Sequence, residues 1–387
     1  MERPPCEVAD IVRAHGEEFQ KQYGHLLDAD GRRVLRAIQN CRTSILGGHV
    51  EECNHCGHRV ISYNSCRNRH CPKCQGAARE RWLSERQSEL LPVPYFHVVF
   101  TLPHQLAPLA LQNKRVVYGI LFRAVAETLL EVAKDPRLLG AEIGFLAVLH
   151  TWGQNLQHHP HLHCVVPGGG LSFDHRQWIG SRNQFLLPVK VLSRVFRGKF
   201  LAMLKRAFRK GKLGFHGQLV SMKTRFHSLI DELHDCEWVV YTKAPFAGPE
   251  HVLRYLAHYT HRVAISNHRI LSVADGEVTF RWKDYAHGNK KRKMTLSGCE
   301  FLRRFCLHVL PKGFVRIRQF GFLANRQRKT LLESCRRLLA ADPVIDAASN
   351  DSGVPPPPLC PVCQTGRLQL VERLPNLLSR PRRLDSS

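Results

Sequence analysis

Paired cysteines near the start of the chain limit its possible folds more than any other feature. Five of the fourteen cysteines lie within residues 53–74, and four of them form the Cys-x-x-Cys pairs Cys53/Cys56 and Cys71/Cys74. A tetrahedral zinc site needs two such pairs brought together by a short folded loop, and a separation of fourteen residues permits this. Such clustering is typical of metal binding in a reducing compartment. We therefore expect a small module that closes on Zn²⁺ held by these four thiolates.

The complete ligand set of this module stays open. Four thiolates leave no position for a reactive water, so the expected zinc is structural. Other possible ligands for a swapped position or a second ion lie nearby: Cys66, His70, His55 and His58. Near the other end of the chain, Cys360 and Cys363 form a further pair that has no evident second pair. We expect that pair to be a truncated or degenerate zinc ribbon.

The charge of the chain indicates a polyanionic partner. Its 57 Lys and Arg residues exceed its 32 Asp and Glu residues, which gives a formal net charge of +25. Nucleic acid is the leading candidate for a partner of such a chain. The sequence has no apolar run long enough to span a membrane and no secretory signal at Met1. A role at a membrane surface is therefore the weaker explanation of the charge.

A histidine-rich strand is the second candidate metal site. In an extended strand successive side chains alternate between faces, so His159, His161 and His163 should share one face at about 7 Å spacing while Leu162 faces a core. His161 and His163 could hold Mg²⁺ or Mn²⁺ with one more protein ligand, either His159 or Gln154. Imidazoles would also suit zinc, so the identity of this metal depends on the reaction.

Two tyrosines stand four residues apart on a predicted helix that begins near Pro249. At that spacing Tyr255 and Tyr259 are neighbours on one face. Aromatic residues so placed commonly pack in a core, but the histidines and arginines around them favour a helix that holds phosphate near a phenol. A tyrosine can attack a phosphodiester, leaving a 5′-phosphotyrosine and a free 3′-hydroxyl, if a cation polarises the phosphate.

The hydrophobic pattern predicts an α+β chain with three parts. Helical periodicity in residues 1–48 precedes the cysteine segment at 49–78. Beyond it we expect strands at 95–101, 143–150, 160–167 and 238–242, a hairpin at 270–282, and helices near 105–134 and 188–210. The strands at 143–150 and 160–167 should pair as a hairpin. The expected domains are 1–92 (helical N-terminus and zinc-binding module), 93–335 (catalytic domain) and 336–387 (linker and short tail).

These motifs, in this order, resemble the rolling-circle insertion-sequence transposases (IS-ninety-one type). The stretches that carry the resemblance are Asn64–Cys74, Trp152–Leu156, His159–His163 and Tyr255–Arg262. The resemblance implies a His-hydrophobe-His (HUH) endonuclease domain with an antiparallel sheet flanked by helices. It also implies that single-stranded DNA is cut and joined at element ends, with His161 and His163 as the metal motif and Tyr255 and Tyr259 as paired nucleophiles. We then expect a bacterial cytoplasmic protein, associated with the nucleoid through DNA.

Two alternative functions remain at this stage. A replication initiator or relaxase would use the same chemistry, although the leading cysteine module favours the transposase. A zinc-dependent DNA-binding regulator would lack catalysis, and its tyrosines would only pack. In each case basic residues should contact DNA, and the candidates are Arg67, Arg69, Lys290, Lys291, Arg292 and Lys293.

Overall fold

The chain forms two compact units, each assembled from segments far apart in sequence. The computed structural model describes residues 4–182, 186–243, 264–284, 290–324, 326–340 and 357–378, together with His251 and Gly288. The first unit comprises residues 1–78, 265–309 and 345–387, and the second comprises 79–264 and 310–344. This division differs from the three consecutive domains that the sequence predicts, because residues 265–309 and the tail join the N-terminal segment.

Three helices form the centre of the first unit. The helices are α1 (Val8–Tyr23), α2 (Ala29–Gln39) and α10 (Gly298–Leu307), with short 3-10 turns at Gly24–Leu26, Ser44–Leu46 and Asn267–Arg269. Side-chain oxygens of Asp28 and Ser297 cap the starts of α2 and α10. Gly298 lies against the ring of His15 on α1, where a Cβ atom would clash. This position therefore favours glycine, which lets α10 approach α1 closely.

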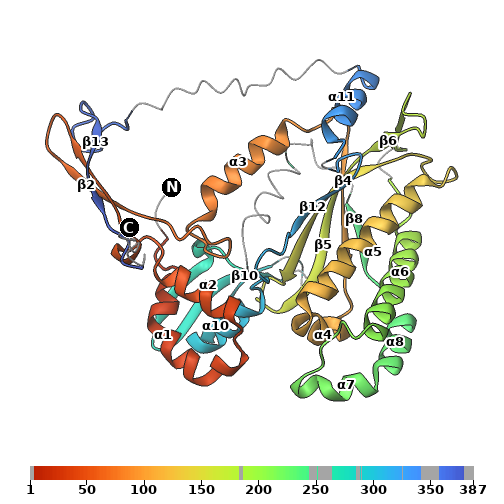
Figure 1. Ribbon diagram of the computed structural model, residues 1–387, viewed down its shortest axis with the longest axis horizontal. Coiled ribbons are helices and arrows are strands. Elements are labelled where there is room, and N and C mark those ends of the chain that lie inside the picture. The colour runs from red at the N-terminus through yellow and green to blue at the C-terminus, as the bar shows by residue number, and fades with distance from the viewer. Residues whose placement is uncertain are drawn as a thin grey trace, which may run out of the picture. The chain divides into compact units, whose positions relative to one another are not determined.

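Two three-stranded antiparallel sheets complete the first unit. One sheet has the order β13-β1-β2, from Leu368–Leu374, Gly48–Cys53 and Arg59–Tyr63 (Figure 1). The other has the order β11-β10-β9, from Lys290–Ser297, Glu277–Asp284 and Ile270–Ala274. The hairpin predicted around Asp275 and Gly276 is confirmed, and both residues have positive φ, 53° and 79°.

A five-stranded antiparallel sheet organises the second unit. Its order is β12-β4-β5-β3-β8, from Ile317–Gly321, Gly144–Trp152, His158–Pro167, Tyr95–Thr101 and Val240–Lys243. A small two-stranded sheet pairs β6 (Gly169–Leu171) with β7 (Trp178–Gly180). The predicted pairing of the strands near 143–150 and 160–167 is confirmed, and it places the histidine strand at the centre of the sheet.

Helices cover both faces of this sheet (Figure 1). One face packs its larger core against α4 (Ala107–Gln112), α5 (Lys114–Lys134), α6 (Val189–Arg209) and α8 (Phe226–Asp235). The opposite face contacts Trp82 of α3 (Gln75–Gln87) and Leu332 of α11 (Arg328–Leu338). The short elements η3 (His104–Leu106), η4 (Gly217–Leu219) and α7 (Val220–Thr224) connect these helices. The predicted α+β class, with an antiparallel sheet flanked by helices and preceded by a helical and cysteine-bearing module, is confirmed.

Side chains alternate between the two faces of the sheet along β5, and residues from Leu162 to Pro167 are all buried because both faces are covered. Leu162 is fully buried in the larger core, and Cys164 and Val166 follow it on the same face. His161 and His163 therefore occupy the face shared with Val165, which belongs to the smaller core. Among the described residues, no helix is long and apolar enough to cross a membrane.

Candidate metal centres

Three histidines converge on the central strands of the second unit. His150 on β4 lies directly opposite His161 on β5, and His163 follows two residues later on the same face. Each side chain offers one ring nitrogen, and these nitrogens all lie within 4.8 Å of one another. His150 and His163 are buried and His161 is half-buried. Because two paired strands carry all three rings, the cluster is held by the hydrogen bonds of the sheet.

The third member of this cluster differs from the one expected. The sequence favoured His159 or Gln154, whereas the structure brings in His150 from the neighbouring strand. His159 is exposed, and its ring lies 5.2 Å from that of His161 between centroids, but its nitrogens are not among those of the cluster. Its carbonyl oxygen accepts a hydrogen bond from His161. Gln154 lies in the connection between β4 and β5. The predicted hairpin carried the missing signal, since pairing the strand that ends at His150 with the histidine strand places His150 across from His161.

Hydrogen bonds fix which ring nitrogens face the cluster. His161 donates its Nδ1 proton to the carbonyl oxygen of His159 at 2.7 Å, so the lone pair of His161 lies on Nε2. Nδ1 of His163 lies 2.7 Å from Nε2 of His97, a buried histidine on β3 whose ring is nearly parallel to that of His163. Partners of this kind orient the rings of metal ligands. No pattern in the sequence marked His97, since a single histidine in an apolar strand is ordinary.

Burial keeps these imidazoles neutral. Removal from water lowers the pKa of His161 to about 4 and the pKa of His97 to about 4, and it lowers the pKa of His163 well below its ordinary value. The neutral imidazole is the form that binds a metal ion. If His150, His161 and His163 bind an ion from one side, its remaining positions are open to oxygen atoms of a substrate. Open positions of this kind are typical of a catalytic centre.

Four cysteines of the first unit form a second cluster. Cys41, which follows α2, meets Cys66, Cys71 and Cys74. The Sγ atom of Cys74 lies 3.3 Å from that of Cys41 and 3.5 Å from that of Cys66. Hydrogen bonds from these thiols, that of Cys41 first, hold the pKa of Cys74 far below its usual range. A thiolate is thereby favoured at the centre of the cluster, as zinc requires.

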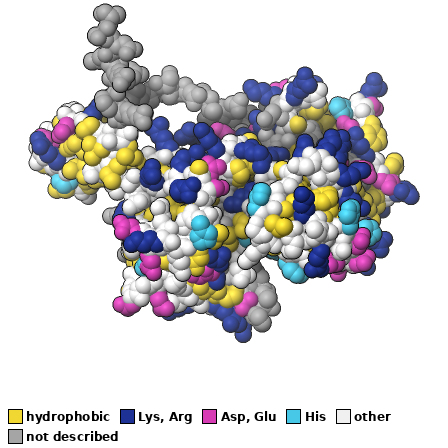
Figure 2. Space-filling view, turned by 60° about the horizontal axis from the view of Figure 1, so that its bottom comes forward, with side chains coloured by type: hydrophobic (Ala, Val, Ile, Leu, Met, Phe, Trp, Pro, Cys, Tyr) yellow, Lys and Arg dark blue, Asp and Glu magenta, His cyan; other side chains and the backbone are white. Residues whose placement is uncertain are grey.

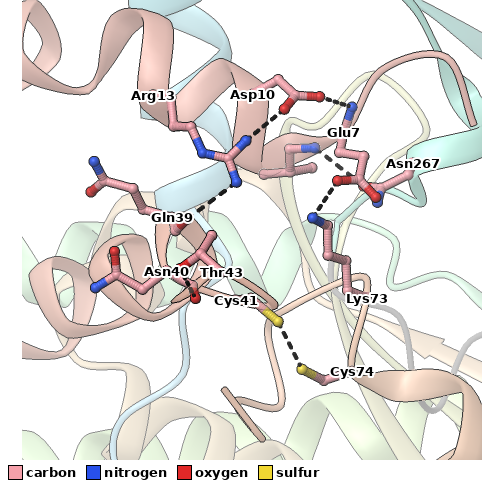
Figure 3. Close-up of polar contacts among 11 residues, drawn as sticks. Glu7, Asp10, Arg13, Gln39, Asn40, Cys41, Thr43, Lys73, Cys74 and Asn267 are labelled. Carbon is pink, nitrogen blue, oxygen red and sulfur yellow. Dashed lines mark hydrogen bonds and ion pairs between the residues drawn. The ribbon is translucent and has the colours of Figure 1, made fainter. Parts of the chain in front are cut away.

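The helices hold this cluster in place (Figure 3). Cys41 and Cys74 point toward one another, and Lys73 beside them forms a partly buried ion pair with Glu7 at the start of α1. His70, named as a possible zinc ligand, is buried near the cluster but does not belong to it. Its ring Nδ1 lies 3.1 Å from Oδ1 of Asn68.

A third cluster joins the two ends of the described chain. Cys53 and Cys56 meet Cys360 and Cys363, with Sγ atoms of all four within 4.8 Å of one another. The single four-cysteine site predicted from Cys53, Cys56, Cys71 and Cys74 is therefore wrong, because its two pairs fall into different clusters. The hairpin of β1 and β2 explains the separation. Cys53 and Cys56 lie at its turn, while Cys66 to Cys74 follow its open end, about 17 Å away for strands of this length.

The residues predicted to contact DNA lie on the surface or close to it. Arg67 is exposed, with φ at 50°, and Arg69 is half-buried. The run Lys290–Lys293 forms the start of β11 and is exposed, although Arg292 also pairs with Asp284 at 3.1 Å. Figure 2 shows a face of the molecule on which Lys and Arg side chains outnumber Asp and Glu. The predicted nucleophiles Tyr255 and Tyr259 lie outside the described residues.

Comparisons with known proteins agree with the cysteine and histidine motifs. The family described as "Transposase zinc-binding domain" matches residues 11–102, and the family described as "Putative transposase" matches residues 144–330. The chain is 53% identical over 402 residues to "Putative transposase y4qJ" of Sinorhizobium fredii, covering all of both chains. It is 31% identical over 327 residues to the transposase for insertion sequence element IS801 of Pseudomonas savastanoi pv. phaseolicola, covering 79% of this chain and 74% of that transposase.

One solved structure also resembles part of the chain. The conjugative relaxase TRWC in complex with ORIT DNA shares 11% identity and a TM-score of 0.24, over 60% of this chain and 94% of the relaxase. A likeness at this TM-score carries no argument about function.

Proposed function

The chain belongs to the IS91-type family of transposases, and from this premise we propose that it cleaves and rejoins single-stranded DNA at element ends through 5′-phosphotyrosine intermediates. Membership of the family makes it a DNA-cleaving enzyme with DNA as its partner. The finer proposal adds the chemistry, the nucleophiles and the metal. The observation that carries it is the convergence of His150, His161 and His163 on adjacent central strands.

The donor set fits a divalent ion with open positions. Nε2 of His161 carries a lone pair because Nδ1 donates to a carbonyl oxygen. If Nδ1 of His163 donates to His97, Nε2 of His163 is available in the same way. Neutral nitrogen donors suit Mn²⁺ better than Mg²⁺, which prefers oxygen ligands. A divalent ion bound there would polarise the scissile phosphate and stabilise the leaving 3′ oxygen.

We assign the nucleophile to Tyr255 or Tyr259. The phenol oxygen forms a bond to phosphorus while the bond from phosphorus to the 3′ oxygen breaks. The proton of the phenol passes in net terms to the 3′ oxygen, which leaves a 5′-phosphotyrosine and a free 3′-hydroxyl. A later attack by a 3′-hydroxyl on that phosphotyrosine restores the phenol. The energy of the phosphodiester is conserved in the intermediate, so joining needs no nucleotide, and the sequence has no phosphate-binding loop of the GxxxxGKS type.

Basic residues of the first unit suit the backbone of this substrate. Arg67 follows the hairpin of β1 and β2. On β11, Lys291 and Lys293 share one face of the strand, and Lys290 and Arg292 share the other. We propose that these side chains contact phosphates and position the DNA without reading its sequence. The zinc at Cys41, Cys66, Cys71 and Cys74 is proposed to be structural, since four thiolates close its coordination sphere.

Formation of a covalent adduct tests the proposal. Full-length protein is incubated with single-stranded end DNA and Mn²⁺ or Mg²⁺, and the adduct is resolved on a denaturing gel. We expect an adduct with the wild type and with Tyr241→Phe, a control at an exposed tyrosine. We expect none with the Tyr255→Phe, Tyr259→Phe double variant. An adduct that survives in the double variant overturns the assignment of the nucleophiles. No adduct with any end sequence supports a non-catalytic DNA-binding regulator.

A further inference from the structure

We propose that Cys53, Cys56, Cys360 and Cys363 bind a second structural zinc ion, which fastens the tail of the chain to its N-terminal hairpin. The matched zinc-binding domain ends at residue 102, so it includes neither Cys360 nor Cys363. This site goes beyond the proposed function, since it concerns neither the histidines nor the tyrosines.

Sulfur distances at this cluster match those around a tetrahedral zinc ion. Sγ of Cys53 lies 3.6 Å from Sγ of Cys363, and Sγ of Cys56 lies 3.7 Å from Sγ of Cys360. Zinc–sulfur bonds of about 2.3 Å in a regular tetrahedron place neighbouring sulfurs about 3.8 Å apart. A disulfide would bring two sulfurs to about 2.0 Å. Sulfurs at these distances leave room for one ion among the four.

The two cysteine pairs fold into the same turn. The residue after the second cysteine of each pair has a positive φ, 71° at Gly57 and 54° at Gln364. In each turn the N–H group of this residue donates to the carbonyl oxygen of the first cysteine at 3.0 Å, Gly57 to Cys53 and Gln364 to Cys360. The same turn therefore presents two cysteines from both segments, although they lie about 300 residues apart.

Backbone donors also point at the sulfurs. The N–H group of His55 lies 3.4 Å from Sγ of Cys53, and that of Gly366 lies 3.3 Å from Sγ of Cys363. Such hydrogen bonds favour the thiolate form that zinc requires. A Cβ atom at Gly366 would come within 2.5 Å of Sγ of Cys53, so this position requires glycine. The two turns therefore pack closely against one another beside the four sulfur atoms.

Apolar burial alone is too small to hold this sheet. The cluster at the site consists of Cys53, Cys360 and Leu368, with Val60 and Cys363 against it. Further along β13, Leu370 and Val371 are each more than half exposed. Small sheets with so little buried apolar surface commonly need a metal or disulfides for stability. A zinc ion at the four thiolates supplies that energy.

Backbone bonds transmit the effect of this ion to the whole sheet. Asn54 donates its N–H group to the carbonyl oxygen of Arg367 at 3.1 Å, and its side-chain oxygen accepts from the N–H group of Arg367 at 2.9 Å. The ladder of β1 and β13 then runs from the pair Cys53/Leu368 to the pair Gly48/Leu374. The site therefore sets the register of the tail against the N-terminal hairpin.

The number of zinc ions per chain tests the proposal. All proteins are full-length and carry His161→Ala, so that the histidine cluster does not add to the count. We expect two zinc ions per chain, measured by inductively coupled plasma mass spectrometry. The double variant with Cys360→Ser and Cys363→Ser should retain one zinc ion. The double variant with Cys71→Ser and Cys74→Ser should also retain one zinc ion. The control Cys6→Ser, Cys236→Ser, at cysteines outside both clusters, should retain two.

A milder variant keeps the test valid if the serine variants fold poorly. Gly366→Ala should release one of its two zinc ions to a chromogenic chelator about tenfold faster or more, since it crowds Cys53. Gly180→Ala, which meets no neighbouring atom, should release zinc as the reference protein does. One zinc ion per chain in the reference protein overturns the proposal, as does an unchanged count in Cys360→Ser, Cys363→Ser. Failure here leaves the adduct assay unaffected, so the two proposals are tested separately.

Discussion

The cysteine clusters of the first unit and the histidine cluster of the second differ in the elements that carry them and in the number of ligands they offer. The cysteines lie in or next to turns, and each cluster offers four thiols, enough to close the coordination sphere of one ion. The histidines come from two paired strands in the middle of a sheet and offer three donors. Turns that lack a core of their own depend on an ion in order to fold, whereas a sheet with a large core can fold without one. The difference matches the two roles proposed above, a structural ion at the cysteines and a catalytic ion at the histidines.

The largest expected effect is the loss of the cluster around Cys74. Cys71→Ser, Cys74→Ser removes two of four ligands of an ion whose binding contributes about 10–16 kcal/mol in small zinc modules. We expect one zinc ion to be lost and the segment between α2 and α3 to become sensitive to protease. Binding of Mn²⁺ at the histidines, followed by electron paramagnetic resonance, should be unchanged. Loss of Mn²⁺ binding in this variant would show that the histidine cluster depends on the cysteine cluster.

The next effect separates the two candidate third ligands. His150→Ala should weaken Mn²⁺ binding by about tenfold or more and reduce adduct formation by about 10³-fold, because a ligand is removed. His159→Ala should change both by less than about threefold, since His159 contributes no nitrogen to the cluster and alanine retains the carbonyl oxygen that accepts from His161. The count of zinc ions at the cysteines should be the same in both. Equal losses in the two variants would return His159 to the ligand set.

The smallest expected effect is that of pH on the histidine cluster. Protons compete with a metal for imidazole, and an ordinary histidine loses about 30-fold in available neutral form between pH 8 and pH 5. The pKa of His161, lowered to about 4 by burial, moves this competition to more acidic solution. We therefore expect protonation of His161 to change Mn²⁺ affinity by less than about twofold over that range. A titration showing a loss of one to two orders of magnitude above pH 5 would contradict the assignment of His161 as a ligand that stays neutral over this range.

Local sequence patterns predicted the helices and strands. The membership of each metal-binding cluster depended on pairing between segments that are distant in the sequence. Alternation along His159–His163 predicted that Leu162 would be buried beside two histidines on the other face, as the structure shows. The spacing of the cysteines predicted the ligand type, but it led us to combine two Cys-x-x-Cys pairs that belong to different clusters. Cys41 carries no local signal and joins its cluster through the position of α2. Cys360 and Cys363 form a recognisable pair, but their partner pair lies about 300 residues away and is set by the pairing of β13 with β1. Likewise, His97 joins the site only through the register of β3 against β5.

The third cluster also has a consequence for how the protein is made. On the ribosome, Cys53 and Cys56 emerge about 300 residues before Cys360, an interval of roughly 15–60 s at about 5–20 residues per second. Throughout that time the hairpin of β1 and β2 lacks its third strand and two of its four thiols. Only a chain translated past Leu374 can close this sheet, so termination before that residue would leave the N-terminal module itself unfinished.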